Sequence, residues 1–141
     1  MTLTMTEQTS TAIQASRTGI ILNTQNFSAC RAFYRDVLGL RELFTRRDGD
    51  DELSCLEFGG AYLMIETGGH AKPAGKSVRE SPAKLRFNVP DLEATLRVLH
   101  EKGIAAEIQR FDWGSTINLF DPDGNRVGIR DEAGFIAQMN P

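Results

Sequence analysis

The residues of this chain that could bind or transform a small molecule alternate with apolar residues in short segments. Lys84 and Arg86 flank Leu85, and Arg126 and Arg130 belong to a later segment of the same kind. Guanidinium and ammonium groups bind carboxylates and phosphates, arginine through a two-pronged hydrogen bond. The sequence therefore predicts an anionic or polar aromatic ligand. The alternative is that these cations pair with nearby carboxylates or extend into solvent.

The histidine and cysteine side chains give weaker evidence for a binding or catalytic role. His70 lies in a glycine-flanked linker and His100 near the end of a helical segment, which is typical of surface histidines. Cys30 and Cys55 lack the C-x-x-C spacing and are expected to be free buried thiols. No histidine accompanies Cys55 in the sequence to activate it, and the phosphate-loop pattern G-x-x-x-x-G-K-[ST] is absent. Nothing here indicates nucleophilic catalysis.

Composition and charge limit the class of protein. A length of 141 residues suits one domain. The net charge of −3 and the pI near 5.4 argue against nucleic-acid binding, which usually needs a basic face. No apolar run approaches the ~18 residues of a membrane helix. The polar N-terminus does not resemble a signal peptide, so a cytoplasmic protein is expected.

Polar segments that lack regularly spaced apolar residues divide the chain into two structured blocks. The expected parts are a flexible N-terminal segment at 1–17, a first block at 18–67, a Gly- and Pro-containing linker at 68–82, a second block at 83–131 and a C-terminal tail at 132–141.

The two blocks repeat each other. Leu22–Ala29 aligns with Phe87–Ala94, and Gly60–Glu66 aligns with Gly124–Arg130. Each block reads as a strand, an amphipathic helix and three further strands. The sequence therefore predicts an α+β fold of two tandem βαβββ modules.

Residues that can begin or end a helix lie at the ends of both predicted helices. Asn26 or Ser28 in the first block and Asp91 in the second can accept hydrogen bonds from free backbone N–H groups at a helix start. Gly39 and Gly103 can take the left-handed conformation that ends a helix.

Alternation along the strands assigns a helix-facing side and an open side to each sheet. The residues expected toward the helices are Ile20, Leu22, Leu63, Ile65, Leu85, Phe87, Val89, Ile117, Leu119, Val127 and Ile129. The open side is then formed by Gly19, Ile21, Asn23, Cys55, Glu57, Tyr62, Met64, Glu66, Lys84, Arg86, Asn88, Thr116, Asn118, Arg126, Gly128 and Arg130. This open side is too polar for a core and suits either a solvated face or a ligand cavity.

Three motifs resemble the vicinal oxygen chelate superfamily, which includes glyoxalase I, bleomycin resistance proteins and extradiol dioxygenases. They are FYRDVLGL at Phe33–Leu40, VPDL at Val89–Leu92 and DPDGN at Asp121–Asn125. The resemblance extends over residues 18–131. It implies a curved mixed sheet around a concave cavity, with helices on the outer face. The ligand-binding candidates are then Asn23, Cys55, Tyr62, Met64, Glu66, Lys84, Arg86, Asn88, Trp113, Asn118, Arg126 and Arg130.

The metal-dependent members of that superfamily hold a divalent ion with His, Gln or Glu on four strands. The resemblance implies that those positions are occupied here by Gly19, Met64, Lys84 and Gly128, although a slip of two residues offers Glu66 in place of Met64. Two glycines, a thioether and a cation do not form a site for a hard divalent metal. No metal and no cofactor are therefore expected.

The leading interpretation is a metal-independent small-molecule binding protein of the bleomycin-resistance type, and the resemblance implies a homodimer. The alternative is an enzyme, either a glyoxalase (lactoylglutathione lyase) or a dioxygenase, with a displaced metal site that uses Glu66. A third interpretation is a partner-binding module whose concave face is filled by its own side chains.

Overall fold

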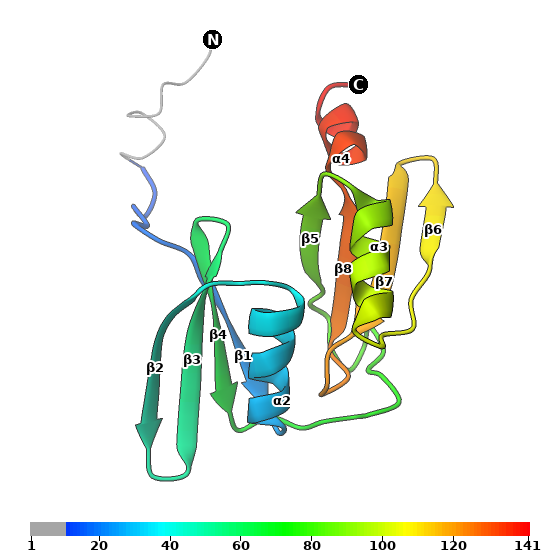
Figure 1. The fold of residues 1–141 in the computed structure, drawn as a ribbon. Helices are drawn as coiled ribbons and strands as arrows, with labels where there is room; N and C mark the ends of the chain where they lie inside the picture. Colours follow the sequence, from blue (N-terminus) through cyan, green and yellow to red (C-terminus); the bar gives the residue numbers. More distant parts are fainter. Residues whose placement is uncertain (1–10) are drawn as a thin grey trace.

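The computed structural model describes residues 11–141, and Figure 1 shows its two halves side by side. The first half contains β1 (Gly19–Thr24), α2 (Phe27–Ala32), the π-helical turn η1 (Phe33–Val37), β2 (Glu42–Asp48), β3 (Asp51–Phe58) and β4 (Ala61–Thr67). The second contains β5 (Leu85–Val89), α3 (Leu92–Glu101), β6 (Ile108–Phe111), β7 (Gly114–Phe120) and β8 (Arg126–Asp131), and α4 (Glu132–Met139) follows it.

Each half folds into a four-stranded mixed sheet with the same topology. The strand order is β1-β4-β3-β2 in the first sheet and β5-β8-β7-β6 in the second. The first and last strands of each half are parallel neighbours, because a helix connects the first strand to the other three. The prediction of an α+β fold built from two βαβββ modules is confirmed.

The core lies between the sheets and the helices that pack on one side of them. Leu63, Ile65, Ile117, Val127 and Ile129 are all buried, as the alternation predicts. Ile20 differs from its prediction, because 38% of it remains exposed where β1 begins. The helix-facing residue at this end of the strand therefore contributes little to the core.

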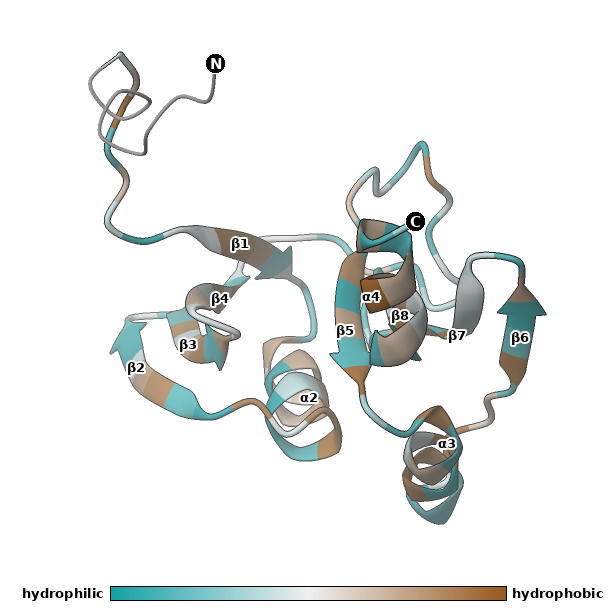
Figure 2. Cartoon of the chain, turned by 90° about the horizontal axis from the view of Figure 1, so that it is seen from above, coloured by the Kyte–Doolittle hydropathy of each residue, from teal (hydrophilic) through white to brown (hydrophobic). Residues whose placement is uncertain are grey.

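Helix α2 packs on the first sheet, on the side toward the second module (Figure 2). The helix begins after Asn26, but the Asn26 side chain does not cap it. The carboxylate of Asp123, in the β7–β8 turn, accepts hydrogen bonds from the backbone N–H groups of Gln25 and Asn26 at 2.6 and 3.0 Å. A residue of the second module thus satisfies the polar groups at the start of the first module's helix.

Helix α3 follows its sequence prediction more closely. Asp91 precedes the helix, and its carboxylate accepts a hydrogen bond from the Ala94 N–H. Gly103 and Gly39 follow the two helical segments with φ angles of 77° and 75°. Side chains rarely tolerate that conformation, so glycine at both helix exits is explained.

Two peripheral segments complete the description. The segment 132–141, expected as a tail, is mostly the helix α4. Asp131 precedes this helix and caps it by accepting a hydrogen bond from the Gly134 N–H. Residues 1–10 of the expected N-terminal segment lie outside the described residues, and residues 11–18 contain neither helix nor strand. No helix within 11–141 has the length and apolar character needed to cross a membrane.

Candidate functional site

The open face of the second sheet carries a row of three residues from adjacent strands. Arg86 on β5 lies opposite Gly128 on β8, and Gly128 lies opposite Asn118 on β7. Because Gly128 has no side chain, the middle of this row is free for its neighbours. The strand order places Gly128 there, since β8 runs between β5 and β7.

Two cationic side chains occupy the space above Gly128. A Cβ atom placed on Gly128 would lie 2.9 Å from Lys84 Cε, 3.5 Å from Lys84 Nζ and 3.1 Å from Arg86 Nε. Lys84 Nζ donates a 2.7 Å hydrogen bond to Asn118 Oδ1, and Asn118 in turn donates to the Gln109 side chain at 2.9 Å. The ammonium group is therefore held in place, and the guanidinium of Arg86 lies beside it.

Lys84 and Arg86 lie close enough together for their positive charges to interact. Partial burial lowers the pKa of Lys84, and the positive charges of Arg86 and Arg126 lower it further. Partial burial also lowers the pKa of Arg86, with a smaller contribution from Arg130. Among residues 11–141, no carboxylate forms a salt bridge with Lys84 or Arg86. The site therefore carries unbalanced positive charge in a partly desolvated position, which favours an anion.

Arg130, two residues after Gly128 on β8, is only 3% exposed. Its guanidinium donates to the Trp113 carbonyl at 3.0 Å and to the Gln138 side chain at 2.6 Å, and it lies 4.8 Å from the centre of the Trp113 ring. Phe111 stacks parallel to Trp113 at 5.2 Å. Arg130 therefore positions Trp113 and α4 and adds positive potential, and both of its terminal nitrogens already donate to these partners.

The other predicted residues of this face lie around its edges. Arg126 donates to the carbonyls of Ser81 and Pro82 in the linker. Asn88 donates to Glu132 at the start of α4 at 2.9 Å. Thr116, expected on the open side, is 2% exposed and donates to the Ile129 carbonyl within the sheet.

The open face of the first sheet carries the remaining candidates, which lie apart from the cations. A Cβ atom on Gly19 would collide with the Tyr62 ring, so that ring covers the glycine. Asn23 donates to the Thr67 carbonyl at 3.0 Å, and Met64 lies opposite Cys55. Burial raises the pKa of Cys55, which keeps it a thiol and agrees with the expected inert role.

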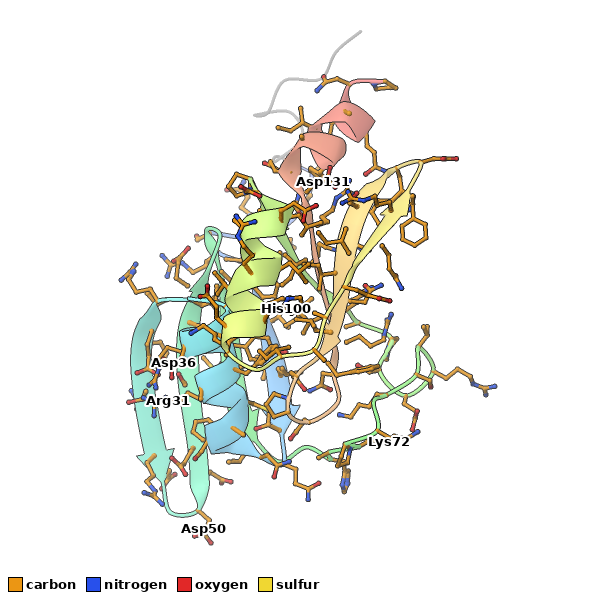
Figure 3. The ribbon with its side chains drawn as sticks, turned by 45° about the vertical axis from the view of Figure 1, so that its right-hand side comes forward. Arg31, Asp36, Asp50, Lys72, His100 and Asp131 are labelled. Atoms are coloured by element: carbon orange, nitrogen blue, oxygen red, sulfur yellow. The ribbon has the colours of Figure 1, made fainter. Side chains whose placement is uncertain are left out.

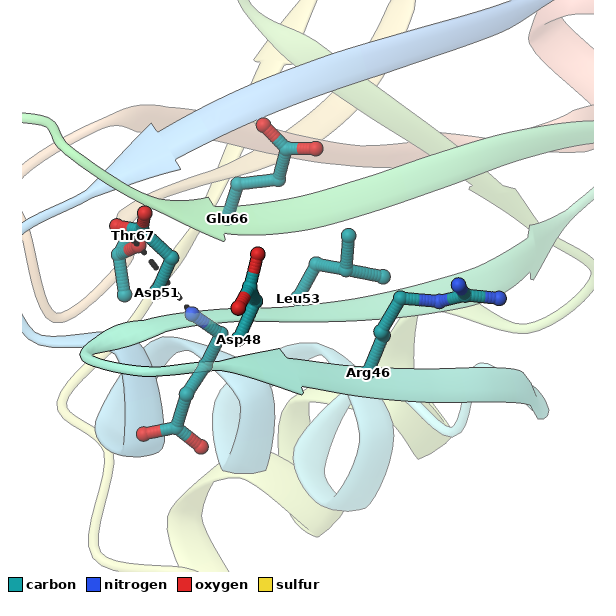
Figure 4. A pocket seen from close by; sticks show the side chains of 7 residues that line it. Arg46, Asp48, Asp51, Leu53, Glu66 and Thr67 are labelled. Carbon is teal, nitrogen blue, oxygen red and sulfur yellow. Dashed lines mark hydrogen bonds between the residues drawn. The ribbon is translucent and has the colours of Figure 1, made fainter.

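Glu66 lines an acidic groove at one end of this sheet (Figure 4). The groove has a volume of about 400 Å³ and is formed by Arg46, Asp48, Asp51, Glu52, Leu53, Glu66 and Thr67. Sequence reasoning missed its β2 residues. Register places Arg46 opposite Leu53 and Asp48 opposite Asp51, so the alternation of β2 was the signal that could have identified them.

The residues that the resemblance puts at the superfamily's metal positions do not fit a divalent metal. Tyr62 covers Gly19, and Lys84 and Arg86 lie over Gly128, so an aromatic ring and two cations fill the space of the expected ligands. Glu66 shares its groove with other acids. No group of three or more His, Cys, Asp or Glu side chains within the described chain is arranged to hold a metal ion.

The histidines lie away from both faces. His100, labelled on α3 in Figure 3, is exposed, and its Nε2 lies 2.9 Å from the Ala106 carbonyl. His70 is also exposed, in the segment between the two modules. Their positions agree with surface roles.

Comparison with known proteins gives the same fold. The profile described as the Glyoxalase/Bleomycin resistance protein/Dioxygenase superfamily matches residues 17–129. The uncharacterized protein YraH of Bacillus subtilis (strain 168) is 29% identical over 119 residues, which cover 78% of this chain and 93% of YraH.

Two solved structures illustrate the range of proteins that share this fold. A lactoylglutathione lyase from Agrobacterium tumefaciens matches with a TM-score of 0.63 and 18% identity, over 85% of this chain and 96% of the lyase. TnmS3, an antibiotic binding protein from Streptomyces sp. CB03234, matches with a TM-score of 0.64 and 17% identity, over 85% and 98%. At these identities the likeness shows the fold alone.

Proposed function

Because the chain belongs to the glyoxalase, bleomycin resistance protein and dioxygenase superfamily, we propose that it is a metal-independent member that binds a small anionic molecule. The observation that carries the proposal is the pair of cations above Gly128. Lys84 and Arg86 surround one point on an open face, and no carboxylate of the described chain pairs with them.

The chemistry of the pair suits a carboxylate or a phosphate. A guanidinium offers two parallel N–H donors to two oxygen atoms, and the ammonium adds a point charge beside them. A bound anion would counter the partial burial and the neighbouring positive charges that together lower the pKa of both cations. Binding of this kind needs a complementary surface and no reactive group, as in a sequestering protein.

The test is calorimetric titration with lactate, benzoate and inorganic phosphate. Trp113 is the only tryptophan, and its ring centre lies 5.8 Å from Arg86 Cζ, so its fluorescence provides an independent signal. We expect Arg86→Gln to weaken binding by about ten-fold or more, which corresponds to one charge-assisted hydrogen bond. Arg97→Gln removes an exposed arginine from α3 and should leave the affinity unchanged. Failure of all three anions to bind would refute the proposal.

Metal independence requires its own measurement. Elemental analysis of purified protein should find no stoichiometric metal, and dialysis against a chelator should leave anion binding intact. One tightly held ion per chain, released together with the loss of anion binding, would instead favour the enzyme with a displaced metal site at Glu66.

We also propose that two copies of the chain form a homodimer that completes the binding cup. Within residues 11–141 no further strand pairs with the sheet edges formed by β1 and β5, which face each other in Figure 1, and Ile21 on β1 is 56% exposed. The first sheet's open face carries Glu57 and Glu66 and the second carries Lys84 and Arg86, so the faces of two copies would complement each other in charge. Light scattering should give the mass of a dimer, and a monomer at micromolar concentration would refute this arrangement.

A further inference from the structure

Lys84 combines features that the binding of an anion alone does not require. Its Nζ is held by Asn118 at 2.7 Å, and the Asn118 side chain is itself fixed by Gln109. Lys72 by contrast bonds to the Glu80 carboxylate, and Lys76 bonds to the Asn125 side chain. Lys84 is thus a positioned amine on an open face, with a second cation rather than a carboxylate beside it.

A lysine in this setting can act as a nucleophile. An amine attacks a carbonyl carbon only in its neutral form, and nearby cations together with partial desolvation favour that form. Burial and the charges of Arg86 and Arg126 lower the pKa of Lys84 in this way. The other requirement is that one ligand can reach both side chains. Arg86 Nε and Lys84 Nζ both lie over Gly128, at 3.1 and 3.5 Å from the position that a Cβ atom on this residue would take.

We propose that Lys84 forms a reversible Schiff base with a 2-oxo acid whose carboxylate is bound by Arg86. In a 2-oxo acid the carboxylate and the carbonyl carbon are adjacent atoms, so one small molecule can engage both side chains at this point. The proposal rests on the anion-binding function and narrows its ligand to a carbonyl acid.

The step balances without an added oxidant or reductant. The Nζ lone pair forms a bond to the carbonyl carbon, and the π electrons of the C=O bond move onto oxygen. Transfer of a nitrogen proton to that oxygen gives a carbinolamine, and loss of one water molecule leaves the imine. Asn118 is a positioning residue in this scheme, because it holds Nζ through a hydrogen bond and does not touch the reacting carbon.

The experiment traps the imine by reduction. The full-length protein is incubated with pyruvate and sodium cyanoborohydride, and peptide mapping compares Lys84 with Lys72, Lys76 and Lys102. We expect Lys84 to gain one carboxyethyl group at least about ten-fold faster than the other lysines. Lys84→Arg should abolish this adduct, Lys102→Arg should leave it unchanged, and Arg86→Gln should slow it by about ten-fold at low pyruvate.

Parallel titration with lactate separates this inference from the proposed function. Lactate carries the carboxylate without a carbonyl, so it reports anion binding alone. If lactate binds and pyruvate gives no preferential adduct at Lys84, the Schiff base is refuted while the anion-binding function stands. If Lys84 reacts equally fast with acetone, which lacks the carboxylate, the assignment to 2-oxo acids is refuted.

Discussion

The hydroxyl of Tyr34 donates a 2.7 Å hydrogen bond to the carboxylate of Asp121, which lies 87 positions later in the chain. Tyr34 is fully buried and Asp121 is 4% exposed, so this bond joins the two modules inside the core. Burial and the negative charge of Asp121 raise the pKa of the Tyr34 hydroxyl, which keeps it protonated as a donor. The relative position of the modules therefore depends on a hydrogen bond to a buried charge.

Tyr34→Phe is expected to destabilise the fold by about 1.5–3 kcal/mol, the range for a hydrogen bond to a charged group. The substitution leaves Asp121 Oδ2 with the Asn125 side-chain amide as its remaining donor. Urea unfolding measures the change in free energy. The chain has one other tyrosine, Tyr62 on the open face of the first sheet, and Tyr62→Phe should change stability by less than about 0.5 kcal/mol. Equal effects of both substitutions would contradict this account.

The sequence predicted the helices and strands and the side of each strand that faces a helix, because the spacing of apolar residues depends only on neighbouring positions in the chain. The repeat and the alternation specify which residues of each strand face a helix, and Leu63, Val127 and Ile129 are buried accordingly. The hydrogen bonds of the Asp123 carboxylate to the backbone just before α2 could not be predicted, because Asp123 comes from a turn almost a hundred residues away. Long-range contacts of this kind depend on how the modules pack.

The candidate site was predicted in part for the same reason. Strand alternation puts Lys84 and Arg86 on the second sheet's open side, and the structure adds that both side chains lie over Gly128. The burial of Arg130 was not foreseen, because it results from α4, which the sequence suggested only as a tail.

Acid should weaken the contribution of Glu42 to stability. The Glu42 carboxylate accepts bonds from Arg31 at 2.7 and 2.8 Å and from Ser54 at 2.6 Å, which lower its pKa from 4.5 to about 2. A carboxyl group whose pKa is lower in the folded state than in the unfolded state stabilises the fold at pH values above its unfolded-state pKa. That stability is lost as the pH falls through its folded-state pKa.

Glu42→Gln should therefore destabilise the protein at pH 7 by about 1–2 kcal/mol, allowing for solvent screening of a partly exposed pair. The difference from the wild type should shrink as the pH falls from about 4.5 toward 2. Urea unfolding across this range measures it. Asp50→Asn, in the exposed β2–β3 turn labelled in Figure 3, is the control and should show no such dependence. A Glu42→Gln effect that is constant with pH would rule out the ion pair as its cause.

Gly128→Ala should weaken anion binding while the fold is retained. The new Cβ would meet Lys84 Cε at 2.9 Å and Arg86 Nε at 3.1 Å, and both belong to the flexible ends of side chains that can move aside. Displacing both cations should lower lactate affinity by about ten-fold, whereas the unfolding free energy should change by less than about 1 kcal/mol. Unchanged lactate affinity in this variant would place the anion elsewhere.

Gln138→Ala should loosen α4 without disturbing the first module. Gln138 accepts a 2.6 Å hydrogen bond from Arg130, and its loss leaves a buried guanidinium with one donor unpaired. No residue of α4 is buried, so a few contacts hold the helix, among them this bond, the hydrogen bond from Asn88 to Glu132 and the Asp131 cap. Amide exchange within α4 should accelerate several-fold, because local opening determines exchange there. Exchange in β3 and β4 should stay constant, and acceleration throughout the chain would show instead that Gln138 supports the whole fold.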